Sequence, residues 1–411
     1  MNNSFYTDVL IIGAGAAGIA AATASVEAGA SVTVVEKLNY PGGCATASAV
    51  GTICGLFLRG EKEVFSMNGL PKEFALNILK KSKKEPQRFS EKLWFIPCQA
   101  NHFRSVAEEY LSHEKINILY NTEVKSISQA GGLIDKIVIE NKNVKQTIFA
   151  KAYIDCSGVG VTLSLLKHPL ILDKQQQAAA VVFQANGILS ENEFSLHHLI
   201  IKYITQAIKP GSEQEFYKLI SIIPGSLKNG SAQFKLGIPW TPEGDPVELN
   251  FHAHKFIHEV LSFLKSGMPQ FENASLAWIA DEVGQRSGAR PIGREILKEE
   301  DVLTCKKRTD EICKGSWPIE FWEIGNKKVN MTYFPQNDYY SIPASCLISN
   351  TFTNLFFGGK LISASEKAIA SARVIGTCLG TGYAAGILAT YKSMGKSEQE
   401  GISFIQNRIS I

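Results

Sequence analysis

The sequence predicts an α/β fold in which a parallel sheet carries a small antiparallel β-meander and is interrupted by an inserted α+β domain. Three observations lead to this fold. Asp8 to Glu36 reads as an apolar strand, a glycine turn, a helix, a second strand and an acid. Residues 116–149 form short strand-like segments around Gly131 and Gly132, which is typical of a meander. Beyond residue 165 the segments become longer and more polar, which indicates a separate domain.

The glycine turn predicts a Rossmann-like dinucleotide site. Val9 to Ile12 is an apolar run suited to a buried parallel strand, and the G-x-G-x-x-G pattern that follows consists of Gly13, Gly15 and Gly18. The helix predicted from Ala16 to Ala28 begins at this turn, so its free N–H groups and the positive end of its dipole face the phosphates. We therefore expect Gly13, Gly15, Ala16 and Gly18 to bind the cofactor.

The second predicted strand, Val32 to Val35, ends in an acid. Glu36 follows Gly18 by 18 residues, and a carboxylate at this place accepts hydrogen bonds from ribose hydroxyls. Glu36 and the adjacent Lys37 are therefore expected at the cofactor. The alternative is a signal peptide or membrane span over Val9 to Val26. It is not favoured, because Asp8 abuts the run, glycines interrupt it and no basic region precedes it.

Composition restricts the class of protein. The chain has 411 residues, of which 45% are apolar and 20% charged, so two or three lobes of a globular enzyme are expected. A net charge of +3 gives no reason to expect nucleic acid, and no span for a membrane is found. The eight cysteines contain no C-x-x-C pair, which favours reduced thiols and a cytoplasmic location without a zinc site.

A metal site at His252, His254 and His258 is considered and not favoured, because no completing ligand is evident.

A second turn, Asn39 to Thr46, carries paired glycines. Together with the dinucleotide turn and Glu36, its G-G-C-A-T segment resembles flavoproteins of the glutathione-reductase-like class, which bind FAD. The resemblance implies that Val124 lies near the adenine. It also implies that the cofactor is contacted by Gly42, Gly43, Cys44, Thr46 and, in the D-C-S-G segment, Ser157 and Gly158. Non-covalent FAD is expected, with a redox or flavin-linking role of Cys44 or Cys54 as the less favoured alternative.

The remaining elements follow in order. Residues 58–97 are predicted as a surface excursion, and His102 to His113 as a helix. The meander is expected from strands at 116–120, 123–128, 133–140 and 146–149, and another buried strand at 152–157. In the inserted domain, residues 177–187 are predicted as a strand, and 213–223, 251–265 and 274–284 as helices.

Two later segments resemble an FAD-dependent oxidoreductase family related to fumarate reductase. In V-G-Q-R-S-G-A-R, Arg286 and Arg290 match the family's arginines. The segment from Tyr340 to Ala389 has the family's frame, with Gly359 expected at the cofactor. Lys360 stands where an arginine is usual, and Ser365 and Trp322 stand where histidines are usual. These departures do not affect the predicted fold, but they put the family's substrate chemistry in doubt.

The resemblance implies a discontinuous FAD-binding domain, 1–164 with 340–395, a substrate domain at 165–339 and a C-terminal tail at 396–411. The site is expected between the lobes. Gly380-Thr381-Gly382 is expected to open the last helix, so that Thr381 and Gly382 face the flavin. Arg286 and Arg290, predicted as catalytic, and Arg373 are candidates for anchoring an anionic substrate or the cofactor, with a structural salt bridge as the equal alternative for each.

The predicted function is FAD-dependent oxidation of a small organic substrate, by a dehydrogenase, oxidase or desaturase that passes hydride to flavin N5. No second dinucleotide turn is found, so an external electron acceptor is expected. Two alternatives stay open: a flavin monooxygenase that uses NAD(P)H and O2, and a non-catalytic FAD-binding regulator. The oligomeric state is left open.

Overall fold

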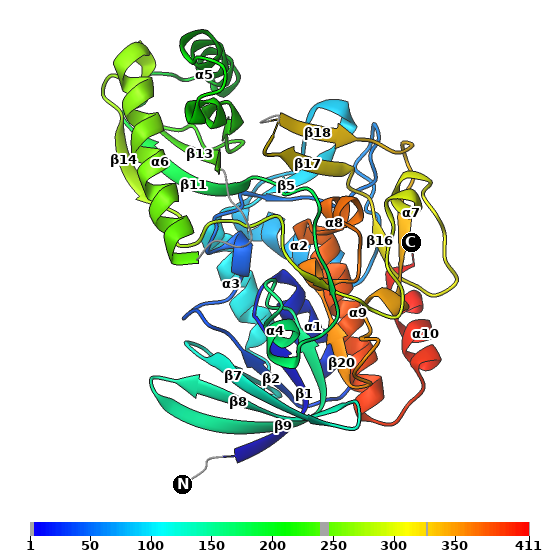
Figure 1. Ribbon diagram of the computed structural model, residues 1–411. Helices are drawn as coiled ribbons and strands as arrows, with labels where there is room; N and C mark the ends of the chain where they lie inside the picture. Colours follow the sequence, from blue (N-terminus) through cyan, green and yellow to red (C-terminus); the bar gives the residue numbers. More distant parts are fainter. Residues whose placement is uncertain (1–3, 239–245, 326–327, 411) are drawn as a thin grey trace.

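A seven-stranded sheet organises the large lobe, at the bottom of Figure 1. The computed structural model describes residues 4–238, 246–325 and 328–410. In it, β1 (Ser4–Ile12) lies between β2 (Val32–Val35) and β9 (Val144–Asp155), with β6 (Ile116–Leu119) outside β2, and all four strands run parallel. The predicted α/β fold with a Rossmann-type sheet is confirmed.

The meander differs from its prediction in two respects. Residues 116–119 do not belong to it, because helix α3 (Ala100–Leu111) carries the chain across the sheet and delivers β6 parallel to β2. Residues 146–149 and 152–155 form one continuous strand, β9. Its first half pairs with the antiparallel strand β8 (Leu133–Asn141), which pairs in turn with β7 (Glu123–Ala130). β1 pairs with β9 from residue 147 to residue 155, and β20 (Leu355–Phe357) pairs with its last three residues.

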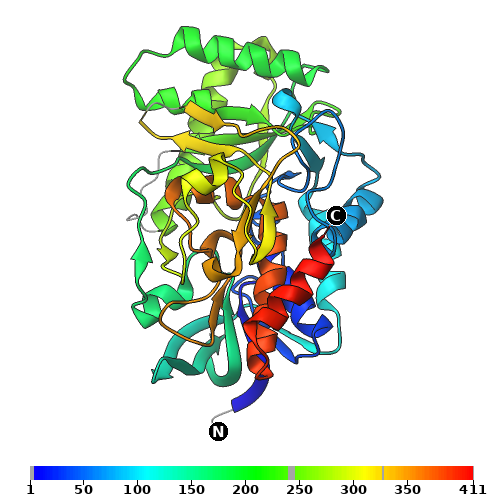
Figure 2. The same cartoon turned by 90° about the vertical axis from the view of Figure 1, so that its right-hand side faces the viewer.

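Two helices rich in small residues pack against this sheet. Helix α1 (Ala16–Glu27) lies against α9 (Ile375–Ser393), and a methyl group at Gly382 would stand only 2.1 Å from the carbonyl oxygen of Ala17. The predicted C-terminal tail contains helix α10 (Glu398–Ile409), which lies beside α9 in Figure 2 and begins with a capping box between Ser397 and Glu400.

Residues 58–97 are not a surface excursion, and this prediction is wrong. Helix α2 (Leu70–Ser82) buries Phe74 and Ile78 completely, and the ring of Phe74 packs at a tilt against that of Phe103 of α3, with ring centroids 5.1 Å apart. The spacing of Phe74 and Ile78 is that of one helical face. The lysines of this segment obscured the face because they occupy the other side. The segment also contributes strands β4 (Gln87–Arg88) and β5 (Trp94–Pro97), which form a small separate sheet with β3 (Thr52–Ile53), just ahead of the segment.

A second lobe, here called the insert lobe, stands at the upper left of Figure 1. Its sheet has the order β12 (Ile220–Ile222), β13 (Ser231–Ile238), β11 (Ala179–Asn186) and β14 (Ser275–Ile279). Helices α5 (Glu193–Ala207) and α6 (Pro246–Gly267) contribute to a core that also holds Phe183 and Phe234. The helix predicted at 251–265 is confirmed within α6.

Two helix predictions in this lobe are wrong. Residues 213–223 form a 3-10 turn, Glu213–Leu219, followed by β12, and residues 274–284 contain β14. In both cases an edge of the sheet was available. Pairing of β12 with β13 and of β14 with β11 outweighed the local helix propensity.

The other elements of the described chain are short. They are α4 (Val161–Leu166), β10 (Leu170–Ile171), β15 (Arg290–Pro291), α7 (Glu299–Leu303), β16 (Glu311–Gly315), β17 (Ile319–Glu323), β18 (Lys328–Thr332), β19 (Tyr340–Pro343) and α8 (Glu366–Ala372). Within the described ranges, no single helix has the length and apolar character to cross a membrane; α8 and α9 meet that measure only jointly, with a 97° bend between them.

Candidate functional site

The first glycine turn and Glu36 lie together at the carboxyl ends of β1 and β2. Gly13 has a φ of +94°, and its N–H donates to the carbonyl of Val35 over 2.8 Å. The Glu36 carboxylate accepts the N–H of Ala14 at 2.6 Å and that of Leu38 at 2.9 Å. Burial raises the pKa of Glu36 against the opposing effect of these two N–H donors. The acid is thus fixed beside the phosphate-binding turn, as predicted from its spacing.

The second glycine turn contacts the first. The N–H of Gly42 donates to the carbonyl of Ala14 over 2.8 Å, and a methyl group at Gly43 would come within 3.0 Å of the Gly15 Cα. Gly15 is the N-cap of α1 and provides no side-chain cap. Backbone N–H groups therefore stand open between two bare turns, which is the cradle that a pyrophosphate requires. Cys44 is exposed beside it, and Thr46 donates to the carbonyl of Pro41.

The third wall of this cradle comes from distant segments. Asp155 accepts the N–H of Ser157 at 3.0 Å and so shapes the D-C-S-G turn, while a methyl group at Gly158 would meet open space. The N–H of Gly359 donates to Thr381 Oγ1 over 3.1 Å. Val124, in β7, is half-buried in the cluster of side chains beneath this sheet.

The last helix does not open at Gly380-Thr381-Gly382. Helix α9 begins at Ile375, five residues earlier, and these three residues lie inside it. Gly382 faces α1, whereas a methyl group at Gly380 would meet Cys313 and Met67. At the true start, the N–H of Gly376 donates to the carbonyl of Cys54 over 2.9 Å. The Thr377 hydroxyl is buried and has no hydrogen-bond partner in the described structure.

Positive side chains gather where the insert lobe meets the large lobe. We call Lys235, Arg286, Arg373 and their one carboxylate, Glu320, the basic cluster. Arg286 Cζ lies 4.0 Å and Lys235 Nζ 4.5 Å from the centroid of the Trp322 ring. Arg373 donates to Gln177 Oε1 at 3.0 Å and to the carbonyl of Glu320 at 3.1 Å, and its buried Nε has no partner in the described structure.

The charges of this cluster act on each other. Burial, followed by the nearby Arg286, lowers the pKa of Lys235 to about 8. Burial and Arg373 lower the pKa of Arg286 to about 9, so it remains protonated at neutral pH. Burial opposes ionisation of Glu320, yet Lys235, Arg373 and the indole N–H of Trp317 hold its pKa below the ordinary value. Because three cations face one carboxylate among the residues that the structure describes, the site favours a negatively charged ligand.

The predicted arginines separate into two groups. Arg286 and Arg373 belong to the basic cluster. Arg290 does not: its side chain is 3% exposed and pairs with Asp173 at 2.5 Å, and its other nitrogens donate to the carbonyls of Ala364 and Gly288. With these partners, the geometry favours the structural alternative for Arg290. Lys37 is likewise paired, with Glu282 from the segment that follows β14.

Sequence reasoning missed Lys235 and Glu320. Each is a charge inside an apolar strand, Q-F-K-L-G and P-I-E-F-W, and that pattern was the available signal. Lys360, noted only as a replacement, lies near the cofactor cradle and donates to the carbonyl of Gln285 over 3.1 Å. The histidines at 252, 254 and 258 are exposed on α6, and no three potential metal ligands gather anywhere in the described residues.

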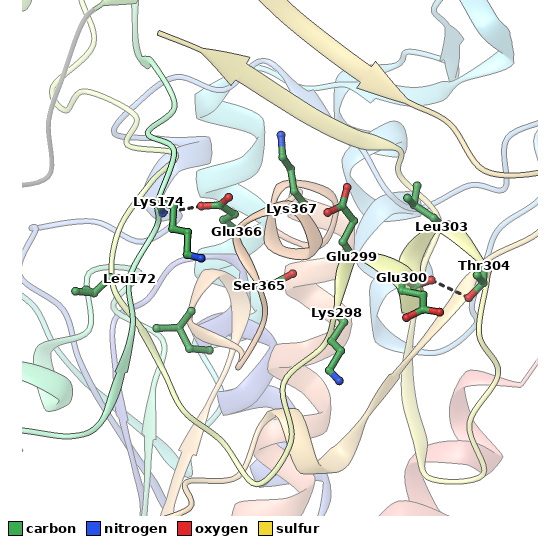
Figure 3. A pocket seen from close by; sticks show the side chains of 11 residues that line it. Leu172, Lys174, Lys298, Glu299, Glu300, Leu303, Thr304, Ser365, Glu366 and Lys367 are labelled. Atoms are coloured by element: carbon green, nitrogen blue, oxygen red, sulfur yellow. Dashed lines mark hydrogen bonds between the residues drawn. The ribbon is translucent and has the colours of Figure 1, made fainter. Parts of the chain in front are cut away.

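Figure 3 shows a surface pocket of about 720 Å³ near the starts of α7 and α8. Its charges are three lysines and three glutamates, and Glu366 already accepts the backbone N–H groups of Lys174 and Gln175. This pocket has no excess charge and no unpaired buried group. The basic cluster is therefore the stronger candidate for substrate.

Comparisons with known proteins agree with FAD as the cofactor of this chain. A family model described as FAD dependent oxidoreductase matches residues 8–407. No curated protein matches the chain. Among solved structures, the chain resembles a flavoprotein/dehydrogenase from Cytophaga hutchinsonii at 15% identity and a TM-score of 0.51, covering 98% of this chain and 83% of that one.

Two further structures have a similar fold. The flavin-dependent brominase Bmp2 is 12% identical with a TM-score of 0.50, over 98% of this chain and 83% of that one. The OxyS anhydrotetracycline hydroxylase from Streptomyces rimosus is 11% identical with a TM-score of 0.50, over 98% of this chain and 65% of that one. At these identities the similarity shows the fold alone.

Proposed function

This chain belongs to the FAD-dependent oxidoreductase family, and we propose that it oxidises a small anionic organic substrate held between its two lobes. The observation that carries the proposal is the basic cluster, in which Lys235, Arg286 and Arg373 face the single carboxylate of Glu320. Buried charge without a counter-ion is costly, so a bound anion would stabilise the site. The finer relation to glutathione-reductase-like flavoproteins stays a prediction.

FAD fits this chain. The two glycine turns leave backbone N–H groups for a pyrophosphate, Glu36 lies at the turn for a ribose, and the buried hydroxyl of Thr377 lacks a partner in the described structure. When bound, FAD supplies a two-electron acceptor for the oxidation. In the proposal the chain's own residues hold the pyrophosphate and ribose, orient the substrate through the basic cluster, and exclude water between the lobes.

Non-covalent binding is part of the proposal. Cys54 is partly buried, and burial raises the pKa of its thiol to about 12, which makes it a poor nucleophile. Purified protein should be yellow, and acid precipitation should release FAD and leave a colourless pellet. Recovery of FMN alone, or of a flavin peptide that contains Cys44 or Cys54, would contradict this expectation.

Anaerobic mixing with candidate anions tests the reaction. A substrate should bleach the flavin absorbance near 450 nm without any nicotinamide, and an external acceptor should restore it. A monooxygenase is the second candidate, since the similar OxyS structure is named as a hydroxylase; it would instead show NADPH-dependent oxygen uptake. Bound FAD that is reduced neither by the candidate substrates nor by NADPH would support the alternative of a non-catalytic FAD-binding regulator.

A further inference from the structure

Lys235 projects from the insert lobe toward the large lobe. In β13 the neighbouring Phe234 and Leu236 are fully buried in the core of the insert lobe, so Lys235 points to the opposite face of the strand. Its partner across the ladder is Val182 of β11. Val182 packs in a small cluster with Ala49 of the large lobe. The ammonium group therefore lies on the face that meets the other lobe.

Trp322 connects Lys235 to the rest of the basic cluster. Lys235 and Arg286 both lie over its indole ring, at 4.5 and 4.0 Å from the centroid. The indole N–H of Trp322 donates to one oxygen of Glu320 at 2.7 Å, and that of Trp317 donates to the other at 2.9 Å. Glu320 is thus held by neutral donors, and in the described structure neither Lys235 nor Arg286 forms an ion pair with it at contact distance.

The donors that remain define a ligand. The cluster carries three positive charges and one negative charge, whereas the adjacent pair of Arg290 and Asp173 is neutral by itself. Arg286 uses Nη1 on the carbonyl of Ala178, and no hydrogen bond is found for Lys235 Nζ within the described chain. We propose, building on the proposed function, that Lys235 together with Arg286 binds a carboxylate group of the substrate and thereby sets the specificity of the site.

The charge of Lys235 makes the idea testable by pH. The groups that face Lys235 are Arg286, Arg373, Glu320 and Cys54, and with burial they place its pKa near 8. Below about pH 8 the ammonium is charged and attracts a carboxylate. As pH rises through this value the free protein loses the proton, so carboxylate affinity falls by about tenfold per pH unit, as expected for one linked proton.

The experiment measures binding rather than turnover. FAD-loaded protein is titrated with acetate, benzoate and succinate from about pH 6.5 to 9.5 at constant ionic strength in chloride, with the flavin absorbance as the readout. Wild type should bind at least one carboxylate and lose affinity above about pH 8. Lys235→Arg should bind without this pH dependence, because a guanidinium stays charged. Lys235→Met should bind at least about tenfold more weakly at pH 7, as loss of one charge-assisted hydrogen bond predicts.

Lys228→Met is the matched control. Lys228 is exposed just before the same strand, and its variant should titrate like wild type. The proposal is overturned if Lys235→Met binds carboxylates as tightly as wild type, if Lys235→Arg keeps the wild-type pH dependence, or if no carboxylate binds wild type. If Lys235→Met fails to fold, the Lys235→Arg titration decides. Binding that depends on Lys235 without any reduction of the flavin would sustain this inference and refute the proposed function.

Discussion

At the scale of single residues, the charged side chains of the lobe junction differ in how fully they are paired. Arg290 has a partner for each of its three nitrogens, whereas Arg373 keeps a buried Nε without one in the described structure. A paired charge serves the fold, and an unpaired one favours a ligand. This difference, which the sequence did not reveal, separates the fully paired Arg290 from the arginines of the basic cluster.

Lys235 should be a destabilising residue in the free protein. Its folded pKa is near 8, below the ordinary lysine value, so the folded state holds the proton less tightly than the unfolded chain. The penalty is full below pH 8 and disappears as pH rises toward about 10.5. Lys235→Met should therefore raise the free energy of unfolding at pH 7 by about 1–3 kcal/mol, measured by urea titration of ligand-free protein. A destabilised variant would mean that Lys235 supports the fold.

Glu36 should serve the cofactor. Glu36→Ala removes a charged acceptor, and a hydrogen bond to a charged group contributes about 1.5–3 kcal/mol, so FAD affinity should fall about tenfold to a hundredfold. Because Glu36 also accepts the N–H groups of Ala14 and Leu38, thermal stability should fall with it. Titration of apoprotein with FAD measures the first effect. Glu114→Ala, at an exposed site, should leave FAD affinity and thermal stability unchanged. Equal losses of FAD affinity in the two variants would exclude a specific role of Glu36 at the cofactor.

At the scale of elements, the close approach of α1 and α9 builds the cofactor cradle. α9 begins at Ile375, and its inner glycines allow contact with the carbonyls of α1. That contact brings the D-C-S-G turn, the start of α1 and Gly359 to one place. A run of glycine and threonine thus serves packing here, although the same run was interpreted as a helix start.

Gly382→Ala tests this packing. The added methyl group would lie 2.1 Å from the carbonyl oxygen of Ala17, so the helices must separate, at a cost of about 1–3 kcal/mol, and FAD content should drop. Gly401→Ala is the control, since a methyl group there meets its nearest atom at 3.4 Å in a helix interior. It should be neutral or slightly stabilising. Thermal unfolding with and without FAD compares the two, and equal behaviour would argue against tight α1–α9 packing.

At the scale of the whole molecule, the segment that leads into the insert lobe lies beside the segment that leads out of it. β10, on the way to the insert lobe, pairs with β15, on the way back. The ion pair of Asp173 and Arg290 lies directly at this crossing, and Arg290 also donates to the carbonyl of Ala364, just ahead of α8. The strand pairing and the ion pair thus join the two connections between the lobes.

Breaking this pair should destabilise the molecule as a whole. Arg290→Met leaves Asp173 buried without its partner, which costs about 3–5 kcal/mol, so a lower unfolding midpoint and poor FAD retention are expected. Arg290→Lys should recover part of the loss, because it keeps the charge but not the other hydrogen bonds. Calorimetry of both variants measures their unfolding midpoints. Normal stability with reduced turnover in Arg290→Lys would restore the catalytic role predicted from the sequence.

The sequence by itself determined the cofactor half of this protein. Gly13, Gly18 and Glu36 lie within one short stretch, and their conformations follow from local geometry: a turn that needs a positive φ, a helix that needs close approach, and an acid at a strand end. Such signals are present in consecutive residues. The Rossmann-type sheet was therefore predicted before any tertiary contact was known, and the FAD family was predicted from the resemblance of this stretch and of later segments to flavoproteins.

Only the tertiary structure decided the position of the basic cluster. Lys235, Arg286, Glu320 and Arg373 come from a strand of the insert lobe, a loop, β17 and the end of α8, separated by up to 138 positions in the chain. A charge within an apolar strand is the one local signal of Lys235 and Glu320, and it does not tell a side chain that faces solvent from one that faces a second lobe. The strand β14 was predicted as a helix for the same reason. Long-range pairing and burial fix both outcomes, because the free energy of a charge or a strand edge depends on what packs against it.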